Sequence, residues 1–224
     1  MRIRTCFAVT LAITAGVVAP LLVNTAANAS TSTAEVTVVH GIPKTPVDVY
    51  LDGKLALNDF VFGTVTKPIA LAPGSYSVAI RPHAASSTSA PILSTTVKVT
   101  AGENAAIVAN LTATGSPTLN VFGDPTSSLP MGDARVIVRH VADAPGVDVY
   151  AGNTKVASDL TNPLKATLVI PAGKVTVKVD VTGTTTTVIG PASFDFKAGT
   201  TTVIYAIGSA TGKTLTVAVQ TYSS

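Results

Sequence analysis

The feature of this sequence that most limits its fold is a segment that occurs twice. The first copy begins at Val36 and reads V-T-V-V-H-G-I-P-K-T-P-V-D-V-Y, and the second begins at Val136 and reads V-I-V-R-H-V-A-D-A-P-G-V-D-V-Y. No insertion separates the copies across this window, so the chain contains an internal duplication and one domain is expected to occur twice. Three distinctive pairs keep a spacing of one hundred positions, namely His40 and His140, Asp48 and Asp148, and Tyr50 and Tyr150.

The first 29 residues have the three parts of a secretory signal peptide. Two arginines form a basic start, residues 7–23 are apolar, and Ala27-Asn28-Ala29 offers the small residues that a signal peptidase needs. The alternative, a retained membrane anchor, is disfavoured because a glycine and a proline interrupt the apolar run and no charged cluster follows it. We therefore predict a signal peptide at 1–29, a secreted or cell-envelope location, and no membrane span after cleavage.

The composition that remains after cleavage excludes several classes of function. The single cysteine, Cys6, lies in the predicted signal peptide, so the mature chain would have no disulfide, thiol nucleophile or cysteine metal site. Without Arg2 and Arg4, thirteen Lys and Arg remain against twelve Asp and Glu, which gives no electrostatic case for nucleic acid. Residues 30–133 carry −2 and residues 134–224 carry +3, and these opposite signs favour docking of the two halves.

Apolar residues alternate by two along most of the mature chain, which predicts strands. In residues 174–181, four valines occupy one face and polar residues the other, as expected for an antiparallel sheet with one face on a core. The strands predicted in the first copy cover residues 36–40, 47–51, 67–71, 75–81, 92–100, 104–111 and 118–122. Those predicted in the second copy cover residues 135–140, 147–151, 165–170, 174–181, 187–197, 201–207 and 214–221.

About seven short strands in each copy predict an all-β fold of two tandem β-sandwiches, of immunoglobulin-like or prealbumin-like type. The Cys–Trp–Cys pattern of true immunoglobulin domains is missing, because the chain has no tryptophan. Residues 124–133 are rich in turn formers and predict a linker. The expected organisation is a first sandwich at 30–123, the linker at 124–133 and a second sandwich at 134–224.

Three segments of the first copy resemble a known family. They are H-G-I-P-K-T-P-V-D-V-Y-L-D-G-K from His40, Phe62-Gly63-Thr64, and L-A-P-G-S-Y-S-V from Leu71. Together they resemble domain-of-unknown-function family 4397, a group of exported, mostly bacterial domains that often occur in tandem. The second copy keeps H-V-A-D-A-P-G-V-D-V-Y and I-P-A-G from Ile170 but has no Phe-Gly-Thr. The resemblance implies an extracellular or cell-envelope β-domain and supplies no activity and no catalytic residues.

The repeated His, Asp and Tyr are the candidates for chemistry that occur in both copies. Alternation places His40 on the inward face at the end of a strand, and it places Asp48 and Tyr50 on the other face of the next strand or at an edge. A functional interpretation makes His40 and Asp48 an acid–base or metal pair. We favour a structural one, in which Asp48 accepts backbone N–H groups of the intervening loop and His40 fills a polar position at the strand end. An unpaired buried donor costs about 1–3 kcal/mol, which is reason enough to retain both residues.

No sequence pattern indicates an enzyme. A serine hydrolase needs a nucleophile beside its base, and no G-x-S-x-G segment occurs. The histidines are His40, His83 and His140, and no H-E-x-x-H segment or close pair supplies zinc ligands. The carboxylates lack the spacing of an EF-hand loop, although a calcium site between loops stays open. We therefore expect no enzyme activity, no catalytic residues, no cofactor and no assigned metal.

Binding is the more plausible activity, and one loop stands out. Residues 81–90 are longer and more polar than their counterpart near 182–187, and loops on a rigid sandwich often carry recognition. Arg81 and His83 are the candidate contact residues of this loop. The alternative, which we favour, is that the loop has no recognition role and is a flexible connector. Residues 201–207 are apolar on both faces, which indicates a central strand or a face covered by the other domain or a partner, with Tyr205 in a core.

The sequence as a whole predicts a non-catalytic structural or protein-interaction module, secreted or attached to the cell envelope. Its partner would be an extracellular or envelope protein or a glycan. The alternative is a protein that binds a small ligand or carbohydrate through its loops or in the crevice between the sandwiches, because pockets favour domain interfaces.

Overall fold

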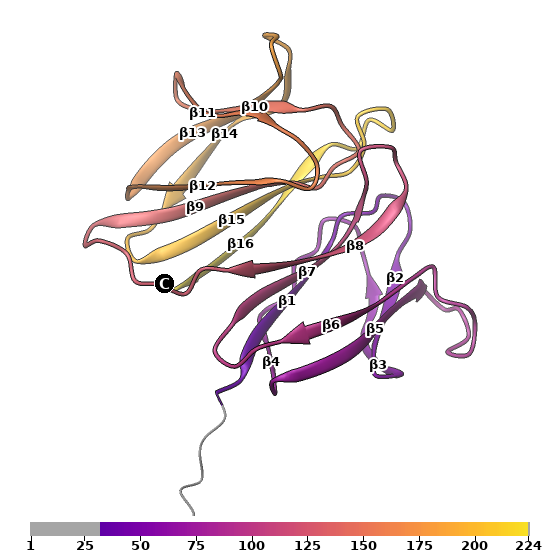
Figure 1. Ribbon diagram of the computed structural model, residues 1–224. Helices are drawn as coiled ribbons and strands as arrows, with labels where there is room; N and C mark the ends of the chain where they lie inside the picture. Colours follow the sequence, from indigo (N-terminus) through magenta and orange to yellow (C-terminus); the bar gives the residue numbers. More distant parts are fainter. Residues whose placement is uncertain (1–31, 224) are drawn as a thin grey trace, which may run out of the picture. The chain divides into compact units, whose positions relative to one another are not determined.

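The computed structural model describes residues 32–223, which form sixteen strands and no helix (Figure 1). The predicted signal peptide and Cys6 lie outside the described residues. The first half contains β1 (Ala34–His40), β2 (Val47–Leu51), β3 (Lys54–Phe60), β4 (Ile69–Leu71), β5 (Gly74–Pro82), β6 (Leu93–Val99), β7 (Asn104–Leu111) and β8 (Pro117–Asp124). The second half contains β9 (Asp133–His140), β10 (Val147–Ala151), β11 (Thr154–Leu160), β12 (Lys165–Pro171), β13 (Gly173–Val181), β14 (Thr187–Phe196), β15 (Thr200–Ile207) and β16 (Thr216–Ser223).

The all-β prediction is confirmed, but each half has one strand more than the seven predicted. The additional strands, β3 and β11, follow the tight turns at 52–53 and 152–153 and pair antiparallel with β2 and β10. Both are edge strands with mostly exposed side chains, and both have an irregular register opposite Val49 or Val149. A bulge interrupts the alternation of side chains, so the usual strand pattern is absent from these sequences.

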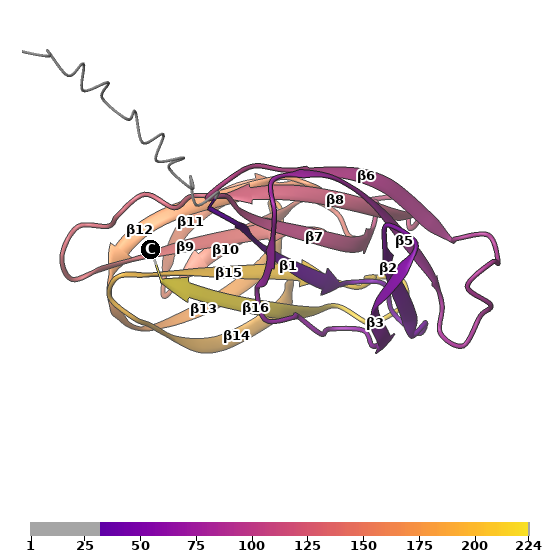
Figure 2. The ribbon, with the colours of Figure 1, turned by 90° about the horizontal axis from the view of Figure 1, so that it is seen from below.

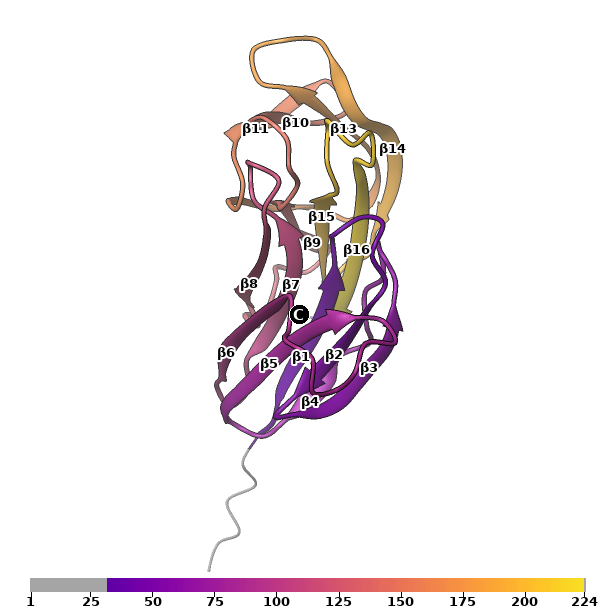
Figure 3. The ribbon, with the colours of Figure 1, turned by 90° about the vertical axis from the view of Figure 1, so that its right-hand side faces the viewer.

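Each half is a sandwich of two four-stranded sheets. In the first half, β4-β1-β7-β8 faces β3-β2-β5-β6, and the second half repeats this order as β12-β9-β15-β16 and β11-β10-β13-β14 (Figure 3). The pairs β1–β7 and β9–β15 are parallel, whereas the other pairs are antiparallel. In immunoglobulin constant domains the first, second, fifth and fourth strands share one sheet. Here β1 and β2 lie in different sheets, so the order favours the prealbumin-like alternative.

A separate apolar core lies between the two sheets of each sandwich. In the first, Val36 and Val38 of β1 pack against Val49 of β2 and Ile80 of β5. In the second, Val136, Val138, Val149 and Val179 are the corresponding residues. The valine rows of the alternating pattern therefore point inward, as the sequence predicted.

A third apolar cluster joins the two sandwiches. It lies between the sheets β4-β1-β7-β8 and β12-β9-β15-β16, here called the inner sheets, which Figure 1 and Figure 2 show from two directions. The contact between the inner sheets is called the seam. The outward faces of β1, β7, β9 and β15 meet in this cluster, which explains why residues 201–207 are apolar on both sides. Gly41 marks the close approach, because a Cβ there would lie 3.0 Å from Ile207 Cγ2. The buried members are Val39, Ala106, Val108, Ile137, Val141, Val203, Tyr205, Ile207 and Ala218.

Candidate functional site

His40 holds the loop that follows β1. Its Nδ1 accepts a hydrogen bond from the Ile42 N–H at 3.3 Å, and its Nε2 donates to the Thr45 carbonyl at 2.8 Å. His140 repeats this arrangement with Ala142 (3.4 Å) and the Pro145 carbonyl (2.9 Å). The ring must be neutral to accept at Nδ1, and burial lowers the pKa of both histidines. These two side chains therefore act as clasps for the β1–β2 and β9–β10 loops.

Asp48 holds two other segments of the chain. Its Oδ1 accepts hydrogen bonds from the Asp59 N–H and His83 Nδ1, both at 2.9 Å, and its Oδ2 accepts one from the Ala84 N–H at 3.3 Å. The sequence predicted that the N–H groups bound by Asp48 belong to the loop between His40 and Asp48. The donors belong instead to β3 and to the loop after β5. Burial alone would raise the pKa of Asp48, but these hydrogen bonds outweigh it and lower the pKa.

Asp148 forms the equivalent hydrogen bonds in the second half, except that the side-chain donor is a lysine and not a histidine. Oδ1 accepts the Asp159 N–H at 3.0 Å and Oδ2 accepts the Gly183 N–H at 3.4 Å, while Lys155 takes the place of the first half's histidine, at 2.6 Å. The hydrogen bonds from Lys155 and Asp159 lower the pKa of Asp148. The hydrogen bonds of Asp48 do not go to His40, and those of Asp148 do not go to His140. The hydrogen bonds of both aspartates go to other groups than those of the acid–base or metal pair in the functional interpretation.

The motif tyrosines are covered by cationic side chains. The Arg81 guanidinium lies 4.7 Å from the centre of the Tyr50 ring, and the Lys178 ammonium lies 4.4 Å from that of Tyr150. Arg81 also donates from Nε to the Ser89 carbonyl at 2.9 Å. Arg81 therefore joins the body of the sandwich to the polar loop at residues 83–92, here called the 83–92 loop.

Arg81 and His83 anchor the 83–92 loop to the body of the sandwich, and most residues of the loop are exposed. His83 binds Asp48, and this hydrogen bond raises the pKa of His83. Within the loop, Ser86 and Ser89 are connected by a backbone hydrogen bond of 2.9 Å and by a bond from Ser89 Oγ at 2.7 Å. Arg81 and His83, the two residues predicted to contact a partner, both hold the loop in place. The exposed residues of the loop are His83, Ala84, Ser86, Ser87, Thr88, Ala90, Pro91 and Ile92.

Sequence reasoning missed a buried polar chain that crosses the seam. Arg139 of β9 is fully buried, donates to Asp124 of β8 and to the Tyr205 hydroxyl (3.0 Å), and lies over the Phe122 ring at 4.4 Å. The Tyr205 hydroxyl in turn donates to Gln220 (2.9 Å). The available signal was Arg139 itself, a charged residue of a predicted strand at the position where the first copy has Val39.

The polar chain ends on the first sandwich. Gln220 of β16 donates to the Thr37 hydroxyl of β1 at 2.9 Å. Asn162 crosses the seam at another point by donating to the Leu111 carbonyl at 2.8 Å. The segment between β8 and β9 is held by Arg135, which donates to the Ser127 carbonyl and hydroxyl at 3.1 and 2.9 Å. The inner sheets are therefore joined by apolar contacts and by directional bonds.

Two crevices open along the seam. One has a volume of about 260 Å³ and contains polar side chains from both sandwiches. The other, of about 370 Å³, lies beside Asp143 and Asn162 and receives Ala113 from the first sandwich. The first crevice is the better candidate for a small-ligand site because its polar groups converge. Its lining residues are Glu35, Thr37, Pro68, Asn104, Gln220, Tyr222 and Ser223.

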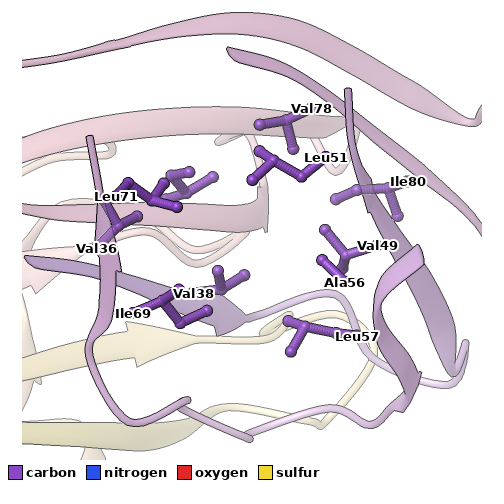
Figure 4. A pocket seen from close by; sticks show the side chains of 11 residues that line it. Val36, Val38, Val49, Leu51, Ala56, Leu57, Ile69, Leu71, Val78 and Ile80 are labelled. Atoms are coloured by element: carbon purple, nitrogen blue, oxygen red, sulfur yellow. The ribbon is translucent and has the colours of Figure 1, made fainter. Parts of the chain in front are cut away.

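A small apolar slot enters the core of the first sandwich between β3 and β4. Figure 4 shows Leu57 and Ala56 of β3, Ile69 and Leu71 of β4, and Val38 of β1 around a cavity of about 60 Å³. All of its lining residues are apolar. The corresponding slot of the second sandwich measures about 30 Å³. No polar group in the larger slot could orient a ligand.

Across residues 32–223, no three His, Cys, Asp or Glu side chains gather closely enough to bind a metal ion. Over the same part of the chain, no helix has the length and apolarity required to cross a membrane.

Two solved structures illustrate what this chain is similar to. One is described as a "putative cell adhesion protein" from Bacteroides uniformis, at 12% identity, covering 86% of this chain and 97% of that one with a TM-score of 0.27. The other carries the same description and comes from Bacteroides ovatus, at 9% identity, covering 86% and 98% with a TM-score of 0.27. These TM-scores are too low to support an inference about function. No curated protein sequence matches the chain.

The family comparison agrees with the first copy. The profile described as "Domain of unknown function (DUF4397)" matches residues 34–150, which include all of β1 to β8 and continue through β9 into β10. The remainder of the second copy lies beyond the match, although its strands repeat the order of the first. On this match, the chain belongs to the family of domains of unknown function DUF4397.

Proposed function

We propose that this chain is a non-catalytic interaction module that works outside the cytoplasm, where it binds an extracellular or cell-envelope protein or a glycan. The observation that carries the proposal is the seam. Its apolar cluster and the Arg139–Asp124 ion pair hold two sandwiches as one body, so loops from both keep fixed positions. Preorganised loops lose less conformational entropy on binding a partner.

The polar residues of the repeated motif support a structural role. His40, His140, Asp48 and Asp148 each form at least two hydrogen bonds to neighbouring loops or edge strands. A general base must instead reach the proton that it removes from a substrate. The bonding capacity of these groups is used to shape loops.

The 83–92 loop is the proposed recognition surface. It is anchored by His83 and Arg81 and displays small hydroxyl side chains, together with Ile92, which is 46% exposed. The equivalent connection in the second sandwich is shorter, because Ile80 pairs with Leu93 while Val179 pairs with Ile189. The two copies differ in length at this point, as expected where one copy has gained a contact surface.

A loop exchange tests this proposal. In the chain from Ser30, residues 83–92 are replaced by residues 182–188, which retains a backbone N–H for Asp48 as Gly183 does for Asp148. A matched control carries Thr184→Ala and Thr185→Ala in the second copy. We expect the exchange to abolish capture of envelope proteins or glycans while the control binds normally. Equal binding by both variants would exclude the loop.

A second candidate function is binding of a small polar ligand in the 260 Å³ crevice of the seam. Polar side chains from both sandwiches converge there, which is the arrangement expected of a ligand site at a domain interface. Thermal shift measurements against mono- and disaccharides test it. A rise in Tm that disappears in Glu35→Ala but persists in the loop exchange would identify the crevice as the site.

A further inference from the structure

The four sheets present eight edge strands, and most of them carry a recognisable protection against pairing with another chain. Charged residues, proline, bulges and very short length are the usual devices. β4 has three residues, and β12 begins with Lys165 and ends with Pro171. β6 contains Lys98, and β14 contains Pro191 and an irregular register. β3 and β11 each contain a lysine, an aspartate and a bulge.

β16 has none of these protections. Its sequence, T-V-A-V-Q-T-Y-S, contains no charge, proline or glycine. It pairs with β15 over all eight residues without a shift in register, so it is a regular strand whose second edge is unpaired. Val219, at its middle, is 40% exposed.

β8 is the counterpart of β16 in the first sandwich and provides an internal comparison. Val121 is exposed to a similar degree, 43%, but β8 begins with Pro117, and Lys165 Nζ donates to the Gly123 carbonyl at 3.3 Å. Thus β8 is blocked at both ends, while the second edge of β16 has no neighbouring strand and no such block.

We propose that β16 pairs antiparallel with β16 of a second copy of this chain. A twofold dimer of this kind closes both open edges at once and extends the inner sheet of each copy into the other. A charge-free strand suits self-pairing, because like charges directly opposite each other would destabilise the pair. This inference is independent of the proposed recognition loop.

The sequence of β16 is self-complementary when the twofold axis passes through Val219. Val219 then faces Val219 of the second copy, and Val217 faces Thr221, so β-branched residues meet on one side of the sheet. On the other side Ala218 faces Gln220, a small residue against a larger one. Cross-strand pairs of β-branched residues are favourable in antiparallel sheets.

Sedimentation equilibrium of the chain from Ser30 tests the dimer. We expect a dimer for the wild-type chain, a monomer for Val219→Lys, and a dimer for the matched control Val121→Lys. Circular dichroism checks that all three remain folded. A wild-type chain that is monomeric at every concentration, or a dimer that Val121→Lys disrupts and Val219→Lys leaves intact, overturns the proposal.

A cysteine variant tests the register. Opposite Cα atoms in an antiparallel pair lie about 4.5–5.5 Å apart, within the range that a disulfide spans. Because Cys6 precedes Ser30, Val219→Cys would carry the single thiol of that chain. We expect mild oxidation to cross-link Val219→Cys into a covalent dimer and to leave Val121→Cys monomeric. Equal rates of cross-linking in both variants would exclude the twofold pairing.

Discussion

Arg139 and Asp124 form an ion pair across the seam, and both side chains are fully buried although they belong to different sandwiches. The guanidinium lies over the Phe122 and Tyr205 rings, 4.4 and 5.3 Å from their centres. A buried charge without its partner is far less stable than a paired one. This pair therefore specifies how the inner sheets dock, in addition to the apolar cluster around it.

We expect Arg139→Met and Asp124→Leu each to lower the free energy of unfolding by about 3–5 kcal/mol, because each leaves one buried charge unpaired. The double variant should lose clearly less than the sum of the two. Urea denaturation followed by tyrosine fluorescence measures all four proteins. Additive losses would show that the two residues are not energetically coupled.

The clasp histidines should make stability depend on pH. Burial lowers the folded-state pKa of His40 and His140 below about 6.5, the usual value in an unfolded chain, so the unfolded state binds protons more readily. Their contribution is complete above pH 6.5 and is lost as the pH falls below that value toward the lowered pKa. We expect Tm to drop between pH 7.5 and pH 5, and to drop less in the His40→Gln, His140→Gln double variant.

His83 should act in the opposite direction. Its hydrogen bond to Asp48 raises its pKa, so its contribution is complete below pH 6.5 and is lost as the pH rises through the raised value. We therefore expect the acid-induced drop in Tm to become steeper in His83→Gln. A His83→Gln variant with an unchanged pH profile would mean that this bond does not stabilise the protein.

Asp48→Ala should destabilise the protein by about 1–3 kcal/mol, because the Asp59 N–H would lose its buried acceptor. Asp48→Asn keeps one acceptor oxygen and should lose less. Differential scanning calorimetry compares the two variants with the wild type. An Asp48→Ala protein of unchanged stability that has lost binding would contradict the structural role and favour a functional one.

Filling the apolar slot should stabilise the first sandwich. Ala56 lines the slot of about 60 Å³, and the second copy has Val156 at this position beside a slot of about 30 Å³. We expect Ala56→Val to raise the free energy of unfolding by about 0.5–1 kcal/mol and Val156→Ala to lower it by about as much. A loss of stability in Ala56→Val would indicate that the slot is too narrow for two more methyl groups.

Local sequence patterns predicted most strands but only part of the site. Alternating apolar residues located β5 and β13, because one face of each strand is exposed to water and the other packs on a core. The same signal failed for β3 and β11, where exposed side chains and a bulge remove the alternation. His83 attracted attention as part of a polar loop, but its bond to Asp48, 35 positions earlier, depends on how β2 and β5 pair.

The sequence by itself determined that one all-β unit occurs twice and that its valine rows point inward, because periodicity and duplication are properties of the linear chain. It also indicated that residues 201–207 have two apolar faces. Only the tertiary structure decided what covers the second face, since the seam requires Val39, Ala106 and Val203 to meet from strands far apart in the chain. The pairing of Arg139 with Asp124 and the open edge of β16 arise in the same way, because both depend on which strands become neighbours and which are left without one.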